Sequence, residues 1–213
     1  MDLITMVLAC SLYTDNSITN AMVQVGSHNN SLAVRSTDGL KIFKTQSDAI
    51  NYTNTALQQG NTIDIGIMQI PSRWAHASHS AAELFAPCKN MVVATKILNQ
   101  AMDRCSELSA NDPSIDEQAC ALSIYKTGNP QAGLDYANAI ISYAKAHSFD
   151  AILAAAKAKN PKEFKMLAGD AATTAATPNA TKLNPSTDPR KAHKVVAANN
   201  DTDDTNATTS STN

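Results

Sequence analysis

The sequence predicts a mainly α-helical fold with one small β-hairpin, followed by a disordered C-terminal tail. Apolar residues recur at helical spacing through most of residues 3–168, and one Asp-Gly dipeptide separates two short apolar runs. The chain has 213 residues, of which 43% are hydrophobic, so it can bury one sizeable core. We therefore expect one domain over residues 1–168 and a tail over residues 169–213.

The first two helices are predicted near the N-terminus. Residues 3–10 are apolar, but no basic residue precedes them and the run is short for a signal peptide, so we expect a helix of the domain. Ser17 is expected to cap the second helix, because serine at this position can accept hydrogen bonds from the first turn. This helix is expected to run to Val25, with apolar residues on one face.

The β-hairpin is predicted from residues 31–34 and 40–43, which flank Asp38-Gly39. Glycine adopts the positive φ that a tight hairpin turn needs, so this dipeptide is a strong turn signal. Ser47 is expected to cap the helix that follows, and Gly60 to end it.

Three further helices are predicted in the second half of the domain. Pro87 is expected to open a long helix, because proline is well suited to the first helical turn. Asp116 or Ser114 starts the next helix, which runs to Tyr125. The dipeptide Asn129-Pro130 is expected to cap and open the last one.

The tail is predicted from its composition. Beyond Asp170 the chain is rich in Thr, Ala, Asn, Asp and Pro and has no aromatic residue, so it cannot bury enough apolar surface to offset the entropy of ordering. The basic stretch 190–194 is either a solvated linker or a docking patch for partner proteins.

The four cysteines, Cys10, Cys88, Cys105 and Cys120, contain no Cys-x-x-Cys spacing, which disfavours a zinc ribbon. An even number suits an oxidising compartment such as the periplasm. Four cysteines allow three pairings, and our hypothesis joins Cys105 to Cys120 and Cys10 to Cys88. Buried free thiols remain the alternative.

Charge and motif content exclude several function classes. The net charge of −2 gives no electrostatic footprint for nucleic acid, and no apolar run has the length of a membrane span. His76 and His79 lie three residues apart without a third ligand nearby, so no metal site is expected. No cofactor is expected either.

Three segments in a fixed order carry the chemical argument. Residues 23–34 read VQVGSHNNSLAV, residues 64–74 read DIGIMQIPSRW, and residues 121–129 read ALSIYKTGN, with PCKN at 87–90 before the third. Each match alone is weak. Together they resemble the lytic transglycosylases, and above all those of type IV secretion and conjugation systems.

This resemblance implies an α+β, lysozyme-like fold that acts on peptidoglycan in the periplasm. Such enzymes cleave the β-1,4 bond between N-acetylmuramic acid and N-acetylglucosamine and leave a 1,6-anhydro product. One glutamate first protonates the glycosidic oxygen and then accepts a proton from the muramyl C6 hydroxyl. This chemistry needs a carboxylic acid that an apolar pocket keeps protonated.

Carried over residue by residue, the resemblance places Gly26 at the position of the catalytic glutamate. It implies that Ser27, Gln69, Tyr125 and Asn129 bind substrate around this position. Glycine has no side chain, and the loss of a general acid typically lowers the rate by about a hundred- to ten-thousand-fold. The chain is therefore expected to be inactive or nearly so.

Other observations leave alternatives open. Pro71 and Lys126 also depart from the family pattern, where asparagine is usual at both places. Asp64 or His28 is an alternative proton donor, and Gly26 is alternatively a simple C-terminal helix stop. Trp74 either stacks on a sugar or packs in the core.

The resemblance implies a role in opening the cell wall locally for a secretion or conjugation machine. Its partners would be peptidoglycan glycan strands and, through the tail, other subunits of that machine. The alternative is a non-catalytic peptidoglycan-binding or scaffold subunit that keeps the cleft without the acid.

Overall fold

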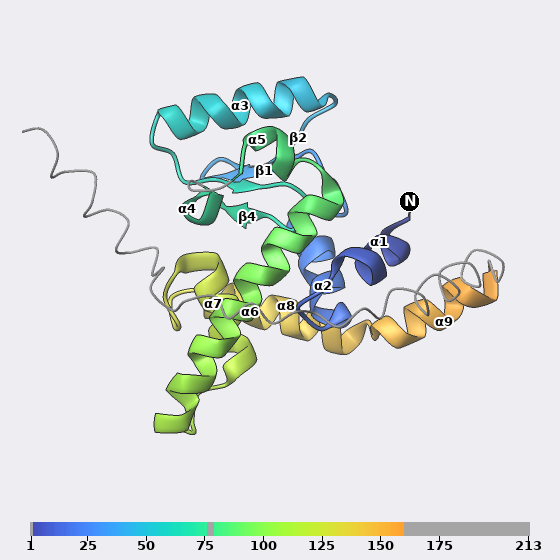
Figure 1. Ribbon diagram of the computed structural model, residues 1–213, viewed down its shortest axis with the longest axis vertical. Coiled ribbons are helices and arrows are strands. Elements are labelled where there is room, and N and C mark those ends of the chain that lie inside the picture. Colours follow the sequence, from blue (N-terminus) through green and yellow to red (C-terminus); the bar gives the residue numbers. More distant parts are fainter. Residues whose placement is uncertain (1, 76–78, 160–213) are drawn as a thin grey trace, which may run out of the picture. The chain divides into compact units, whose positions relative to one another are not determined.

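The computed structural model describes residues 2–75 and 79–159, which are mainly helical with one small sheet (Figure 1). The predicted fold class is confirmed by this helical content and by an antiparallel hairpin. The tail from residue 169 lies outside the described residues, so its disorder and the domain division stay predictions. No helix in the described part is long and apolar enough to cross a membrane. The elements are α1 (Leu3–Cys10), α2 (Asn16–Ser27), β1 (Ala33–Ser36), β2 (Gly39–Ile42), α3 (Gln46–Gln58), β3 (Asp64–Ile65), β4 (Ile70–Pro71), α4 (Ser72–Ala75), α5 (Ala81–Leu84), α6 (Pro87–Asn111), α7 (Glu117–Thr127), α8 (Leu134–Ala146) and α9 (Phe149–Lys159).

Helix α2 begins and ends two residues away from its predicted limits. Its N-cap is Asp15, whose carboxylate accepts hydrogen bonds from the main-chain N–H groups of Ser17 and Ile18, so the prediction of Ser17 as cap was wrong. The residue in left-handed conformation at the other end is His28, with φ 53°. Gly26 therefore lies inside the last helical turn, and its interpretation as a helix stop is also wrong.

Two other caps differ from expectation. Thr45, not Ser47, accepts the capping hydrogen bond of α3. Helix α8 begins at Leu134 because the Asn129 side chain caps a separate turn, accepting from the main-chain N–H groups of Gln131 and Ala132. By contrast, Pro87 opens α6 and Asp116 caps α7, as predicted.

The sheet contains the predicted hairpin and two strands that were not predicted. Strands β1 and β2 pair antiparallel around the Asp38-Gly39 turn, where Gly39 has φ 108°. Strands β3 and β4 have two residues each and extend the sheet in the order β2-β1-β3-β4. They form because their main chains pair with β1 and with each other, an arrangement that local periodicity does not reveal.

Helix α6 runs from the part of the domain that contains the sheet to the part that contains α7 (Figure 1). The sheet and helices α3 to α5 lie toward its N-terminal end, and α6 packs against α1 and α7. Helix α2, which carries the first motif segment, packs against α8 and α1. The core includes Val23, Met68 and Tyr125, all fully buried, so all three motif segments contribute to it.

Both disulfides of the sequence hypothesis are present. Cys10 of α1 pairs with Cys88 of α6 across 78 residues, and Cys105 of α6 pairs with Cys120 of α7 across 15 residues. All four cysteines lie in the described part of the chain, and none of them is free. Each bridge ties a neighbouring helix to α6.

We expect the two disulfides to contribute unequally to stability. Loop-closure entropy gives about 3 kcal/mol for a loop of the Cys105–Cys120 size and about 4–5 kcal/mol for one of the Cys10–Cys88 size. C10A/C88A is therefore expected to lose more free energy of unfolding than C105A/C120A in urea titrations. Equal losses would contradict an entropic origin.

Candidate functional site

The three motif segments meet at the loop between β3 and β4. The main-chain N–H of Gly66 donates to the carbonyl of Ala33 at 2.9 Å, which joins this loop to the first segment. The Tyr125 hydroxyl donates to the carbonyl of Met68 at 2.9 Å, which joins it to the third. Tyr125 and Met68 are 57 residues apart in sequence. The three segments that resemble the family in sequence therefore meet at one place in the fold.

The Asn90 side chain of α6 holds this loop in shape. Its Oδ1 accepts from the main-chain N–H of Met68 at 2.8 Å, and its Nδ2 donates to the carbonyls of Ile65 at 3.0 Å and Leu84 at 2.7 Å. Asn90 is fully buried. Gly66 has φ 78°, and a Cβ there would collide with the Asn90 amide and the Leu84 carbonyl. The loop therefore requires both residues, and its dependence on Asn90 was not foreseen from the sequence.

Gln69 lies in this loop with its side-chain amide turned inward. Its Nε2 donates to the carbonyls of Gly66 at 2.8 Å and Ala33 at 3.2 Å. Its backbone has φ 52°, uncommon for a residue other than glycine. The residue is only 3% exposed, and its Oε1 is buried without a hydrogen-bond partner in the described residues. Buried acceptors without a hydrogen-bond partner are rare in native proteins, so this oxygen is a candidate contact for a bound group.

Gly26 lies against Gln69. A Cβ built at Gly26 would meet Gln69 Cγ at 3.1 Å and Cβ at 3.6 Å, and no other described atom outside its own helix and chain neighbours lies within 4 Å. Its φ is not positive, so the backbone does not require glycine here. A side chain at position 26 needs only a small shift of Gln69. The absence of a side chain is thus a feature of this sequence rather than a demand of the fold.

The predicted substrate residues around Gly26 make internal contacts in this structure. Ser27 is fully buried and its Oγ donates to the Val23 carbonyl at 3.1 Å. Tyr125 is also fully buried, and burial raises the pKa of its hydroxyl well above the usual value. Asn129 is exposed, with its side chain capping a turn. Their roles in binding substrate stay predictions.

Trp74 has its ring nitrogen occupied. Its Nε1–H donates to the carbonyl of Tyr125 at 2.7 Å, and the residue is half-buried. This contact fixes α4 against the C-terminal part of α7. It satisfies the indole donor and leaves part of the ring exposed.

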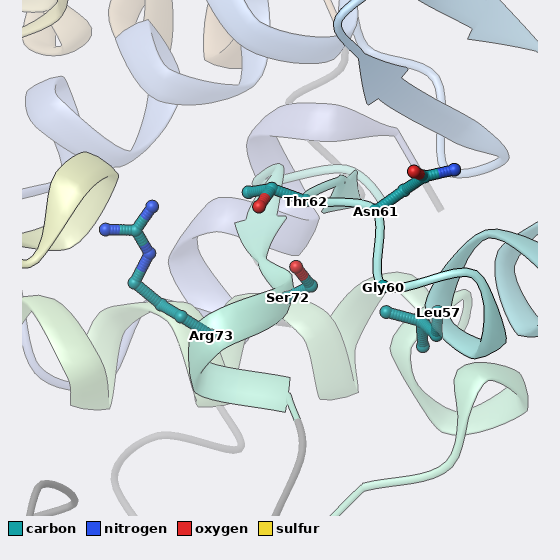
Figure 2. A pocket seen from close by; sticks show the side chains of 6 residues that line it. All are labelled: Leu57, Gly60, Asn61, Thr62, Ser72 and Arg73. Carbon is teal, nitrogen blue, oxygen red and sulfur yellow. The ribbon is translucent and has the colours of Figure 1, made fainter.

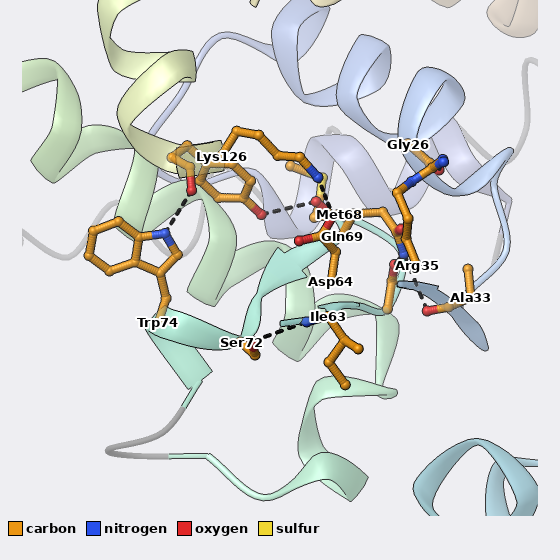
Figure 3. Close-up of polar contacts among 12 residues, drawn as sticks. Gly26, Ala33, Arg35, Ile63, Asp64, Met68, Gln69, Ser72, Trp74 and Lys126 are labelled. Carbon is orange, nitrogen blue, oxygen red and sulfur yellow. Dashed lines mark hydrogen bonds and ion pairs between the residues drawn. The ribbon is translucent and has the colours of Figure 1, made fainter. Parts of the chain in front are cut away.

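A charged cluster lies beside the loop (Figure 3). Asp64 of β3 forms an ion pair with Lys126 of α7, and Arg35 of β1 is the cross-strand partner of Asp64. Lys126 also lies over the ring of Tyr136 in α8 at 5.6 Å. Burial raises the pKa of Tyr136, Asp64 raises it further, and Arg35 lowers it, so the charges of this cluster act on one another.

Arg35 and Tyr136 are neighbours of the site that were not predicted from the sequence. The Arg35 Nη2 donates to the main-chain carbonyl of Gly26 at 2.8 Å. Figure 3 shows the Arg35 side chain passing Gln69 to reach Gly26. The only signal in the sequence was Arg35 itself, a cation directly after the apolar-Ala-apolar strand motif.

The two alternative proton donors are poorly placed. The His28 side chain is exposed, and its Nδ1 lies 3.1 Å from the carbonyl of Gln24, one turn back along α2. Asp64 is already the ion-pair partner of Lys126. A general acid must be free to give its proton to the substrate. Neither group replaces a side chain at position 26 in this arrangement.

A pocket of about 430 Å³ lies next to β3 and β4 (Figure 2). Four of its six lining residues are polar, and three of these, Asn61, Thr62 and Arg73, are exposed. The floor includes Ser72, whose Oγ accepts from the main-chain N–H of Ile63 at 3.2 Å. A Cβ at Gly128 would lie 3.3 Å from Arg73 Nη1, so the pocket borders the third motif segment.

The described ranges contain no group of three or more His, Cys, Asp or Glu side chains placed to hold an ion. His76 lies outside the described residues.

The three segments that meet at the loop between β3 and β4 are those that resemble the transglycosylases in sequence. Residues 11–154 match the family model of the transglycosylase SLT domain. This match covers more than half of the chain, and the chain therefore belongs to the SLT family, whose lytic transglycosylases act on peptidoglycan. No curated protein and no solved structure matches the chain.

We expect N90A to loosen the motif loop. The substitution leaves two buried carbonyls and one N–H without partners, and each orphaned group costs about 1–3 kcal/mol before the structure relaxes. The free energy of unfolding should fall by about 2–4 kcal/mol in urea titrations. Q100A, which removes an exposed amide from the same helix, is the control and should change it little. Equal effects of the two variants would refute the role of Asn90.

Proposed function

We propose that this protein binds peptidoglycan with the SLT fold but does not cleave it by the mechanism of its family. The observation that carries this proposal is Gly26, which lies in the last turn of α2 at the position that the family resemblance gives to the catalytic glutamate. The φ of Gly26 is not positive, so the backbone accepts other residues, and no carboxylate of the described residues lies within 4 Å of a Cβ built there. The protein is thus an inactive lytic transglycosylase homologue that serves as a glycan-binding subunit.

The need for a proton donor in the family reaction supports the proposed loss of cleavage. The first step of the family reaction breaks the glycosidic bond only if the leaving oxygen receives a proton. The carboxylate of Asp64, at the start of the motif loop, is paired with Lys126, and the His28 ring turns back toward its own helix. Binding does not depend on this proton. A cleft that keeps its shape without the acid still binds the unreacted strand.

The polar pocket beside β4 is proposed as part of the glycan-binding surface. Asn61, Thr62 and Arg73 offer exposed donors and acceptors, which suit hydroxyl and acetamido groups of a sugar. The guanidinium also suits the carboxylates of the peptides that peptidoglycan carries. The pocket borders Gly128 of the third motif segment, so a strand lying along the motif loop reaches it.

We further propose that this role belongs to a type IV secretion or conjugation machine in the periplasm. The resemblance to transglycosylases of these machines supports the context, and the two disulfides suit an oxidising compartment. One of these bridges uses Cys88 of the Pro-Cys-x-Asn motif. The tail from residue 169 is proposed to contact other subunits.

A genetic experiment tests this context. Deletion of the gene is expected to abolish DNA transfer, and the full chain, but not residues 1–168, is expected to restore it.

Purified sacculi incubated with the wild-type protein should release no 1,6-anhydromuramyl products above the buffer control. The missing proton donor is the reason, and mass spectrometry of the soluble fraction is the measurement. The same protein should sediment with the sacculi. Release of anhydro products would overturn the proposed inactivity, and failure to sediment would overturn the binding role.

Arg73 is expected to contribute to binding. R73A should weaken sedimentation with sacculi by roughly tenfold, the usual loss for one charged contact of about 1–2 kcal/mol. K96A removes an exposed cation from α6, away from the pocket, and is the matched control. If both variants bind equally well, the pocket is not part of the glycan surface.

A further inference from the structure

We propose that Arg35 is a second determinant of the lost cleavage, because its guanidinium makes position 26 a place for an anion rather than for a neutral acid. This inference rests on the proposed function and concerns the same site. It means that restoring a glutamate at position 26 is not enough to restore the family reaction at neutral pH.

The geometry places the charge of Arg35 beside the main chain of residue 26, more than 4 Å from a Cβ built there. Its Nη2 lies 2.8 Å from the carbonyl oxygen of Gly26. A guanidinium has five N–H donors, and this is the one side-chain hydrogen bond of Arg35 among the described residues. A Cβ built at position 26 meets only Gln69 among the described residues outside its own helix and chain neighbours, so a glutamate there needs a small shift of Gln69 before its carboxyl can approach the remaining donors.

Two groups would act on a glutamate at position 26 in opposite directions. The orphaned Gln69 Oε1 accepts a hydrogen bond from a protonated carboxyl and so favours the neutral acid. Arg35 favours the carboxylate, and an opposite charge within about 4–6 Å typically lowers a carboxyl pKa by 1–3. Charge-assisted hydrogen bonds are roughly twice as strong as neutral ones. Arg35 therefore prevails.

The other titratable groups around the site do not cancel this charge. Asp64 is paired with Lys126, and this pair has no net charge. Burial raises the pKa of both Tyr125 and Tyr136, so both stay neutral near pH 7. His28, at the end of α2, is exposed and turned toward Gln24. Asp64, Lys126 and Arg35 together therefore carry one net positive charge among these described neighbours.

The test compares G26E, G26E/R35Q and G26E/R35K in the full chain. Glutamine removes the charge and keeps an N–H donor, whereas lysine keeps the charge. The measurement is release of 1,6-anhydromuramyl products from sacculi as a function of pH. The family acid works only while protonated, so a lowered pKa moves the loss of activity on the alkaline side to lower pH. G26E and G26E/R35K should lose activity about 1–3 pH units below G26E/R35Q.

A second measurement tests the effect of Arg35 on the introduced carboxyl even if no variant cleaves. Carboxyl-¹³C NMR of each variant gives the titration midpoint of the introduced carboxyl directly, because its signal is the one absent from wild type. G26E/R35Q should titrate about 1–3 pH units above G26E. G26E/K41Q, which removes an exposed cation from neighbouring β2, should titrate like G26E. Circular dichroism confirms that each variant is folded.

The outcomes separate this inference from the proposed function. Equal titration midpoints of the introduced carboxyl in G26E and G26E/R35Q would overturn the role of Arg35 and leave the binding role of the wild type untouched. Cleavage by the wild type would overturn the proposed function whatever the midpoints are.

Discussion

The buried amide of Asn90 is the interaction on which the arrangement of the site depends. It satisfies the N–H of Met68 and the carbonyls of Ile65 and Leu84 at once, so it fixes both ends of the turn that Gly66 makes. Gln69 follows this turn with a positive φ, and its side chain reaches back to the carbonyl of Gly66. A buried polar network is stable only when its members are satisfied, which explains why the loop has one shape. Helix α6, anchored by both disulfides, supplies the rigid base from which Asn90 acts.

What the sequence predicted well was carried by local signals. Pro87 marks the start of α6 and Asp38-Gly39 marks the hairpin turn. Both disulfide pairs agree with the hypothesis chosen among three possible pairings. Where several polar residues competed for one cap, the choice failed, because Asp15 and Ser17 are equally good capping types two residues apart. Strands β3 and β4 were missed since two residues carry no periodicity. The contacts of Arg35 with Gly26 and of Lys126 with Asp64 depend on folding, the latter across 62 residues.

The missing side chain at position 26 has an energetic cost for the fold. Glycine inside a helix destabilises it by roughly 0.5–1 kcal/mol relative to alanine, and the orphaned Gln69 Oε1 adds about 1–3 kcal/mol. The hydrogen bond from the Arg35 guanidinium goes to the main-chain carbonyl of Gly26, so it does not depend on which side chain stands at this position. The helix end keeps this contact although it lacks the group that the chemistry needs.

Binding and cleavage place different demands on such a site. Cleavage needs an interaction that strengthens as the glycosidic bond breaks, and the proton of a neutral acid is that interaction. Binding needs a cleft of fixed shape with polar groups in place, and the residues that supply the shape here, Asn90 and Tyr125, do so through contacts that do not involve position 26. Loss of the acid can therefore leave recognition intact. In the proposed role, the Arg35 guanidinium beside the Gly26 carbonyl makes position 26 unfavourable for a neutral acid. The same positive charge attracts a strand that carries carboxylates, so under this proposal one residue both opposes the reaction and favours retention of the glycan.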